Sequence, residues 1–170
     1  MIFFENDHIV IRSMEQEDIQ RMLYEGHSAD LYATYFKEQE RGTRYVLIAE
    51  YDGEHAGYAT LRVQATTGPF ANAGIPEIAD FNVLAKFRRR GIGSIILDEA
   101  EKKAGELCGR VCLGVGLHAG YGAAQRMYAK RGYLPDGSGV WYKDQVLTPY
   151  TTCCNDDDLI LYMSKTIIYQ

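Results

Sequence analysis

Hydrophobic and polar residues alternate along this chain with two different periods, and the period distinguishes strands from helices. Short runs with apolar residues at every second position, or with apolar residues throughout, predict strands. The predicted strands occupy residues 8–12, 45–51, 55–63, 78–84, 111–117, 140–147 and 159–168. Longer runs with apolar residues three or four positions apart predict helices. The predicted helices occupy residues 14–25, 28–41, 92–107 and 123–131.

The helix predicted over 92–107 has the clearest pattern of the four. Its apolar stripe recurs every four residues, at Ile92, Ile96, Ala100 and Ala104. Most of its charged residues lie off that stripe, so one face would be buried and the other solvated. At other helix ends, Ser13 is placed to cap the helix that follows it, and Gly132 is placed to end the helix over 123–131.

The order of these elements predicts a mixed α/β (α+β) fold. A strand and two helices come first, then a meander of strands, then alternating strands and helices, which indicates a mixed sheet with helices on both faces. Asp52-Gly53 predicts a hairpin turn between two of the strands. Residues 65–76 are rich in turn formers and predict a loop, either a substrate-facing lid or an ordinary connection. With 170 residues and no internal repeat, residues 1–170 are expected to form a single domain.

Composition narrows the function classes. The net charge of −5 disfavours a general nucleic-acid binder, because such proteins usually carry a basic surface. No apolar run approaches the roughly 20 residues of a membrane span, and the N-terminus lacks the pattern of a secretory signal. We therefore expect a cytoplasmic protein with no membrane or nucleic-acid partner. Reduced thiols and no metal site are expected from the spacing of its cysteines, Cys108, Cys112, Cys153 and Cys154.

The segment between the strand over 78–84 and the helix over 92–107 is the main candidate for a binding site. It reads Arg88-Arg89-Arg90-Gly91-Ile92-Gly93-Ser94. Glycines allow the backbone to approach a ligand, and the helix start offers unpaired N–H groups and a partial positive charge. This junction therefore predicts a site for a phosphate or diphosphate group, with the arginines as additional cations.

Two other phosphate-binding patterns are weaker. The nucleoside triphosphate loop requires Gly-Lys-Ser/Thr, and that tripeptide does not occur in the chain. Gly114, Gly116 and Ala119 match the glycine spacing of a dinucleotide-binding turn, but only about 50 residues follow them, too few for the second half of such a domain. A dinucleotide-dependent oxidoreductase therefore remains only as a third hypothesis.

Arg88, Gly91 and Gly93 also satisfy the spacing [RQ]-x-x-G-x-[GA], and here the sequence resembles the GNAT superfamily of acetyl-CoA-dependent N-acetyltransferases. Residues 124–133, AQRMYAKRGY, resemble the second signature of that family, a helix that carries a tyrosine and ends in glycine plus an aromatic residue. The resemblance covers most of the chain. It implies a mostly antiparallel twisted sheet whose central strand, here around Phe81 to Leu84, splays from its neighbour.

The resemblance also implies how coenzyme A would bind. Its pyrophosphate would sit on the backbone N–H groups of residues 89–94, with help from the side chains of Arg88 and Arg90. Its pantetheine arm would pair with the backbone of Phe81 and Val83, and the Val83 N–H would polarise the thioester carbonyl. One departure is Tyr121, which stands where many members have an asparagine that contacts the cofactor arm.

A proton acceptor and a proton donor complete the expected site. Deprotonating a lysine-like amine with a pKa of about 10.4 costs roughly 4.6 kcal/mol at pH 7, so a base or a water relay is useful. Glu77 is the favoured base, acting through water, and Asp80 is the reserve, expected on the opposite face of the strand. Tyr128 matches the family's general acid for the departing thiolate.

The sequence thus favours an acetyl-CoA-dependent N-acetyltransferase that uses direct attack in a ternary complex. A non-catalytic acyl-CoA-binding sensor is the alternative. The acceptor is a primary amine of a small molecule or peptide, which the acidic charge of the protein would favour when it is cationic. Neither the identity of the acceptor nor the oligomeric state, for which a homodimer is one option, follows from the sequence.

Overall fold

The structure is a computed structural model that describes residues 1–23 and 27–167. Its strands form a single nine-stranded sheet in the order β1-β2-β3-β4-β5-β6-β9-β7-β8. The bounds are Ile2–Glu5 (β1), Ile9–Ser13 (β2), Arg44–Tyr51 (β3), Glu54–Arg62 (β4), Glu77–Val83 (β5), Arg110–Gly116 (β6), Leu134–Tyr142 (β7), Gln145–Val146 (β8) and Leu159–Thr166 (β9). All neighbouring strands pair antiparallel except β5 and β6, which pair parallel. The mixed, mostly antiparallel sheet predicted from the sequence is confirmed.

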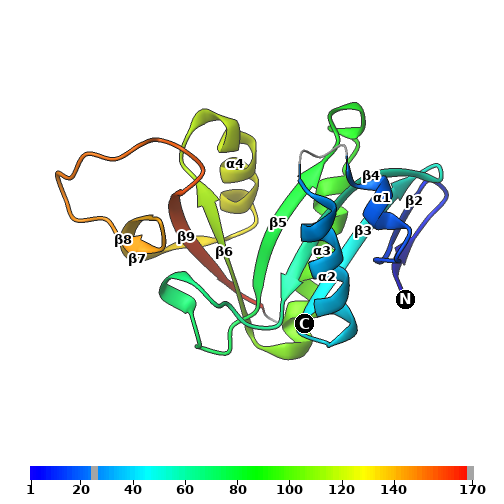
Figure 1. The fold of residues 1–170 in the computed structure, drawn as a ribbon, viewed down its shortest axis with the longest axis horizontal. Helices are drawn as coiled ribbons and strands as arrows, with labels where there is room; N and C mark the ends of the chain where they lie inside the picture. Colours follow the sequence, from blue (N-terminus) through cyan, green and yellow to red (C-terminus); the bar gives the residue numbers. More distant parts are fainter. Residues whose placement is uncertain (24–26, 168–170) are drawn as a thin grey trace.

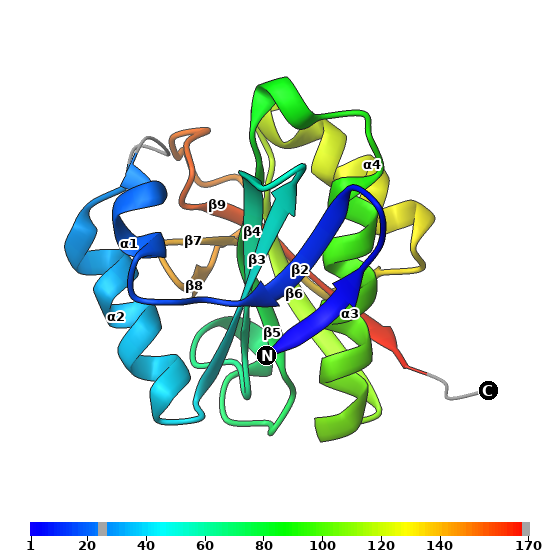
Figure 2. The same cartoon turned by 90° about the vertical axis from the view of Figure 1, so that its right-hand side faces the viewer.

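Helices cover both faces of this sheet (Figures 1 and 2). The α-helices are Asp18–Arg21 (α1), Ala29–Glu40 (α2), Ile92–Leu107 (α3) and Gly122–Lys130 (α4), and short 3-10 turns lie at Gly68–Phe70 (η2), Ala85–Phe87 (η3) and Ala119–Tyr121 (η4). In Figure 2, α1 and α2 lie on one side of the sheet and α3 and α4 on the other. Within the described residues, no helix is long and apolar enough to cross a bilayer.

The two faces have separate cores. On the α3 face, the predicted stripe of Ile92, Ile96, Ala100 and Ala104 is at most 1% exposed and packs against β3, β4 and β6. On the other face, Tyr32 and Tyr35 of α2 pack on Tyr58 of β4. The loop over 65–76 buries Phe70 and Ile75 against the β6–β9 half of the sheet. It is therefore anchored by its own apolar side chains.

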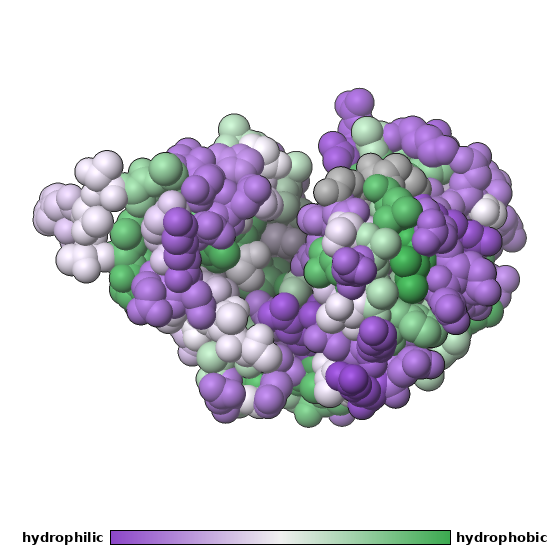
Figure 3. Space-filling view, viewed as in Figure 1, coloured by the Kyte–Doolittle hydropathy of each residue, from purple (hydrophilic) through white to green (hydrophobic). Residues whose placement is uncertain are grey.

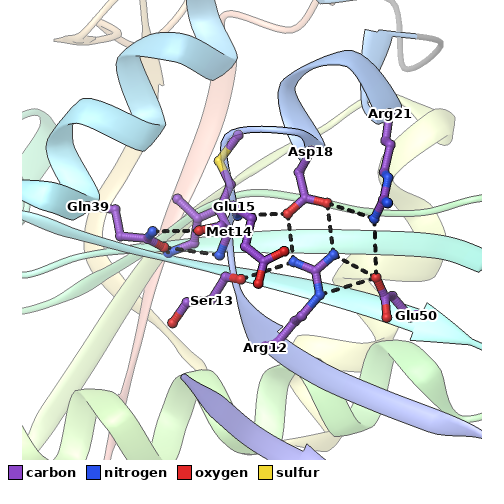
Figure 4. Close-up of polar contacts among 9 residues, drawn as sticks. Arg12, Ser13, Met14, Glu15, Asp18, Arg21, Gln39 and Glu50 are labelled. Carbon is purple, nitrogen blue, oxygen red and sulfur yellow. Dashed lines mark hydrogen bonds and ion pairs between the residues drawn. The ribbon is translucent and has the colours of Figure 1, made fainter. Parts of the chain in front are cut away.

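The first helix is much shorter than predicted. The sequence predicts residues 14–25, whereas α1 covers only Asp18–Arg21, and residues 24–26 lie outside the described part of the chain. Ser13 ends β2 instead of capping a helix. The carboxylate of Asp18 accepts the Glu15 N–H at 2.8 Å and two hydrogen bonds from the Arg12 guanidinium, at 2.6 and 2.8 Å (Figure 4). This buried ion pair holds the segment that follows β2 in place, so the segment needs only one helical turn to be stable.

Arg12 also ties this turn to the sheet. Its guanidinium donates to Glu50 of β3 at 2.6 Å and to the Ser13 carbonyl at 3.1 Å. Burial raises the pKa of Asp18, but the hydrogen bonds and charge of Arg12 more than offset this, so its pKa lies below the usual range.

Two other parts of the sequence prediction differ from the structure. The strand β1 was not predicted, since its four residues carry too few alternations to register as a pattern. The predicted strand over 140–147 is interrupted by a turn at Lys143 and Asp144, which have positive φ angles of 50° and 61°. These two residues form a tight hairpin between β7 and β8 although neither is glycine.

Candidate active site

The central feature of the site is a gap in the sheet between β5 and β6. Only Glu77 and Ile78 of β5 have partners on β6, namely Cys112 and Leu113. Beyond that point the two strands diverge, and in Figure 1 the gap between them widens toward the end at which α4 lies. The splayed central strand implied by the sequence resemblance is therefore present.

A β-bulge on β5 lies where the divergence begins. Ala59 of β4 pairs with Phe81 while the next residue, Thr60, pairs with Ala79, so Asp80 is an additional residue without a partner on β4. Its φ angle is +51°, in the left-handed region. Bulges bend a strand and increase its twist, which explains why β5 leaves β6 at this point.

The backbone of Phe81 and Val83 faces the gap. Leu84 N–H donates to Ala56 O of β4 at 2.9 Å, and the Asn82 carbonyl also points to β4, where it lies against Gly57. Because successive residues of an antiparallel strand alternate in hydrogen-bonding direction, Phe81 and Val83 direct their N–H and C=O groups away from β4. Their N–H groups are therefore directed into the gap, where a ligand could pair with them, whereas the Val83 carbonyl already accepts a hydrogen bond from Arg88 Nε at 2.9 Å.

The glycine turn lies at one end of this gap. Gly91 is the N-cap of α3 with a φ angle of +81°, which an L-residue adopts only with strain. A Cβ on Gly93 would lie 3.1 Å from the Phe81 ring, so the absence of a side chain lets α3 approach β5. The first turn of α3 thus points its unpaired N–H groups toward the end of the gap, as an anion site requires.

The three arginines differ in their positions. Arg88 Nε donates to the Val83 carbonyl at 2.9 Å, so this side chain reaches back to β5. The Arg90 guanidinium stacks over the Tyr51 ring, 4.8 Å from its centroid, and lies 5.9 Å from the centroid of the Phe87 ring of η3. Arg89 is exposed and has a φ angle of +61°. The backbone at this turn is therefore better placed for a phosphate than the side chain of Arg90.

These elements surround a cavity of about 520 Å³. It is lined by Phe81, Asn82, Val83, Phe87, Arg88, Arg89, Gly91, Ile92, Gly93, Ser94, Gly120, Tyr121, Ala123, Ala124 and Met127. Every predicted cofactor-binding residue except Arg90 is among them. In the space-filling view of Figure 3 the surface is deeply hollowed between the two halves of the molecule. A nucleotide-bearing ligand with an extended amide arm fits this combination of an unpaired strand, an apolar wall and a helix N-terminus.

Sequence comparison with known families agrees with this geometry. Residues 11–133 match the acetyltransferase (GNAT) family. The chain belongs to the GNAT acetyltransferase family. As a member, it is an acetyl-CoA-dependent N-acetyltransferase. No protein of curated function matches it in sequence.

Solved structures share the fold of this GNAT acetyltransferase at low sequence identity. An acetyltransferase of Salmonella typhimurium that modifies the N-terminal serine of ribosomal protein L7/L12 has a TM-score of 0.72 at 12% identity, covering 99% of this chain and 100% of its own. Naa50 of Arabidopsis thaliana, solved with the bisubstrate analogue CoA-Ac-MVNAL, has a TM-score of 0.65 at 15% identity, covering 94% and 99%. YncA of Salmonella typhimurium, solved with its cofactor acetyl-CoA, has a TM-score of 0.67 at 17% identity, covering 96% of both chains.

Tyr128 of the acetyltransferase lies in α4, on the α3 face. It is 6% exposed, its ring meets Tyr133 at 5.7 Å, and burial raises its pKa to about 12. Within residues 1–23 and 27–167 no hydrogen bond of its hydroxyl is recorded, and Tyr128 is not among the residues that line the cavity, so its contact with the ligand stays a prediction. A tyrosine with this pKa stays protonated at neutral pH, which is compatible with the predicted role as an acid.

Glu77 occupies the closed end of the gap. It is 6% exposed and accepts a hydrogen bond from Arg62 of β4 at 3.1 Å. Burial raises its pKa, and the charge of Arg62 partly opposes the rise. The role of Glu77 as a base remains a prediction.

The orientation predicted for Asp80 is wrong. An uninterrupted strand would place it opposite Glu77, but the bulge turns it to the same face, where Tyr35 of α2 donates to its carboxylate at 2.8 Å. Arg62 lies on this face too, because it pairs with Arg44, whose guanidinium covers the Tyr35 ring at 4.2 Å. The partner Tyr35 was not found from the sequence, since nothing in the helical pattern distinguishes it from a core residue.

Tyr121, which replaces the usual asparagine, lies across the gap from β5. Its ring packs on Gly116 and meets His118 at 4.6 Å, and its hydroxyl donates to Asp157 at 2.9 Å. Gly116 is thus a packing residue at the end of β6, and Gly114 packs against Ile160 and Tyr162. These contacts explain both glycines without a dinucleotide. The described residues hold no group of three or more potential metal ligands.

Proposed function

We propose that this enzyme acetylates a primary amine by direct attack on acetyl-CoA, and that the α-amine of a peptide is the first acceptor to test. The observation that carries the proposal is the gap between β5 and β6, which places unpaired strand backbone next to the glycine turn of α3. The peptide N-terminus is suggested by similar structures that act on protein N-termini or carry a peptide-based bisubstrate analogue.

In this proposal the pantetheine arm pairs with Phe81 and Val83 as an added strand. The pyrophosphate lies on the backbone N–H groups between Arg89 and Ser94, with Arg88 beside it. The Val83 N–H then donates to the thioester oxygen, where negative charge develops as the amine attacks. One such preorganised donor is typically worth about 10²–10³ in kcat.

Tyr128 supplies a proton to the sulfur as the carbon–sulfur bond breaks. A thiol with a pKa of about 8.5 is a tolerable leaving group, so the expected contribution is modest. No covalent acetyl-enzyme is required, because the amine itself is the nucleophile. Residues 1–170 would act as one catalytic domain.

The test is release of free thiol from acetyl-CoA by purified protein. The acceptor panel should contain short peptides with free N-termini, including MVNAL, as well as polyamines and lysine derivatives. Acetyl-CoA binding, measured by calorimetry on the same sample, shows that the protein is folded and competent. Tight binding without thiol release from any amine would refute catalysis and leave only a binding role.

A further inference from the structure

Tyr121 borders the coenzyme A cavity on the side opposite β5. It belongs to η4, between the end of β6 and the start of α4, and its neighbours Gly120 and Ala123 line the cavity with it. Its ring packs so closely on Gly116 that a Cβ there would overlap the ring. The ring is therefore held between the end of β6 and the cavity, and its position determines that part of the cavity wall.

The hydroxyl of Tyr121 is directed to Asp157, to which it donates at 2.9 Å. The same carboxylate oxygen, Oδ1, lies 2.9 Å from Nε2 of His118. Nδ1 of His118 accepts the Gly120 N–H at 3.0 Å, so the proton of the neutral imidazole lies on Nε2, which donates to Asp157. Asp157 thus receives two hydrogen bonds from residues at the wall of the cavity.

Asp157 belongs to residues 147–158, the segment between β8 and β9. Nine of these twelve residues are exposed and none is buried, so the position of the segment depends on a few contacts such as those of Asp157. A second hydroxyl also reaches the segment, since Tyr142 of β7 donates to Asp156 at 3.3 Å. In Figure 1 the segment lies on the β9 side of the molecule, and in Figure 2 its orange-red ribbon lies on the same side of the sheet as α1.

The acceptor has to approach from this side of the sheet. The cavity is lined by residues of β5, η3, α3, η4 and α4, so the coenzyme A arm would occupy the α3 side of the gap. An amine then reaches the thioester through the gap from the α2 side. Burial raises the pKa of Tyr121 to about 12, and the charges of Asp157 and Asp80 add to the rise. The Tyr121 hydroxyl therefore lies within electrostatic reach of β5 across the gap.

We propose that Tyr121 is a positioning residue that couples the two substrate sites. The coenzyme A arm packs against its ring, and its hydroxyl, through Asp157, holds the 147–158 segment as one wall of the acceptor site. This rests on the acetyl transfer proposed above and names a residue that determines the affinity for the acceptor. When acetyl-CoA fills the cavity it restricts the ring, so the hydrogen bond to Asp157 persists for longer. Because such coupling is reciprocal, the acceptor binds more tightly to the acetyl-CoA complex than to the free enzyme.

Tyr121→Phe tests the coupling, because it removes the hydroxyl and keeps the ring. Amide hydrogen exchange of residues 147–158 is measured on the full chain by mass spectrometry, with and without saturating acetyl-CoA. One hydrogen bond of this kind changes an equilibrium by about 2- to 10-fold. We expect acetyl-CoA to slow exchange in the segment about 3- to 10-fold in the wild type and less than about 2-fold in the variant.

Tyr142→Phe is the matched control. It also removes a hydroxyl that donates to an aspartate of the segment, but Tyr142 is not among the residues that line the cavity. It should keep the wild-type slowing by acetyl-CoA. Calorimetry on the same samples should show that acetyl-CoA affinity falls in Tyr121→Phe by no more than the lost coupling factor, as reciprocity requires.

Steady-state kinetics give a second measurement, on any peptide that the wild type acetylates. Tyr121→Phe should raise KM for the peptide about 3- to 10-fold, because the wall of the acceptor site is held less firmly. Its kcat should stay within about 2-fold of the wild type, since the contacts of β5 with the thioester do not change. An unchanged KM, or a loss in kcat alone, would refute the positioning role.

The outcomes separate this inference from the proposed function. Acetyl-CoA binding without slower exchange in the 147–158 segment, or equal slowing in Tyr121→Phe and the wild type, would refute the coupling and leave acetyl transfer standing. The expected exchange pattern without acetylation of any amine would refute the proposed function, and with it the role of the segment as a wall of an acceptor site.

Discussion

Replacing Gly57 by alanine should damage both the fold and the chemistry, because β4 and β5 approach most closely there. A Cβ at this position would lie 2.9 Å from the Val83 Cα and closer still to the Asn82 carbonyl oxygen. Ordinary carbon contacts lie at about 3.5–4.0 Å. Both neighbours are backbone atoms and cannot rotate away, so the strands must part by at least about half an ångström.

The cost can be estimated from this displacement. Overpacking of this kind costs about 1–3 kcal/mol, and in a protein of this size each kcal/mol lowers Tm by about 2–4 °C. The hydrogen bond from Leu84 N–H to Ala56 O, at 2.9 Å, lies beside the site and would lengthen. The proposed oxyanion donor, Val83 N–H, moves with the strand. A misplacement of 1 Å costs about 100-fold, so we expect kcat to fall about 10-fold.

Thermal unfolding and steady-state kinetics measure the two effects on one preparation. Gly109→Ala is the matched control, because nothing lies within 4 Å of its Cβ position and its φ is not in the left-handed range. It should leave Tm and kcat unchanged. A Gly57→Ala protein with wild-type Tm and kcat would show that neither stability nor catalysis depends on the close approach of β4 and β5 at this point.

Three other predictions concern separate parts of the molecule. Asp18→Asn leaves the Arg12 guanidinium without its buried counter-charge and should lower the free energy of unfolding at pH 7 by about 3 kcal/mol in urea titration. Since the native pKa of Asp18 lies below that of the unfolded chain, its stabilisation is full above about pH 4 and is lost as the pH falls further, through the lower native pKa. An equal deficit in the variant at about pH 7 and at about pH 3 would contradict this. Gly93→Val should weaken acetyl-CoA binding at least 10-fold by calorimetry while circular dichroism stays native, because the branched side chain meets the Phe81 ring. Tyr128→Phe should lower kcat about 10-fold and spare coenzyme A affinity, and an unchanged kcat would remove Tyr128 from the mechanism.

The sequence predicted those parts of the fold that are governed by local periodicity. The helix over 92–107 has the predicted bounds, and the glycine after α4 has the expected positive φ, at Gly132. The hairpin at 52–53 and the loop around Phe70 also lie where the pattern placed them. In each case a repeating apolar stripe or a turn residue encodes the structure within a few positions.

What could not be predicted depends on contacts between distant residues. The bulge at Asp80 arises from pairing with β4, and no glycine marks it, so the strand seemed regular in sequence. The helix predicted over 14–25 is reduced to one turn because Arg12, which also donates to Glu50 of β3, ties Asp18 to the sheet. The positions of Arg88 and Arg90 depend on the Val83 carbonyl and the Tyr51 ring that they contact, and the spacing of the motif does not encode these contacts.

The gap between β5 and β6 also makes an unpaired strand edge in the interior of a sheet. Such edges recruit strands from other chains when they are long and flat. Here the edge offers the backbone of only Phe81 and Val83, with a bulge before it and the turn η3 after it, and the Arg88 side chain already covers the Val83 carbonyl. It is too short for a foreign strand, yet long enough for a ligand arm with a few amide groups. The same dimensions therefore disfavour the addition of a foreign strand at this edge and suit the short amide arm of the ligand.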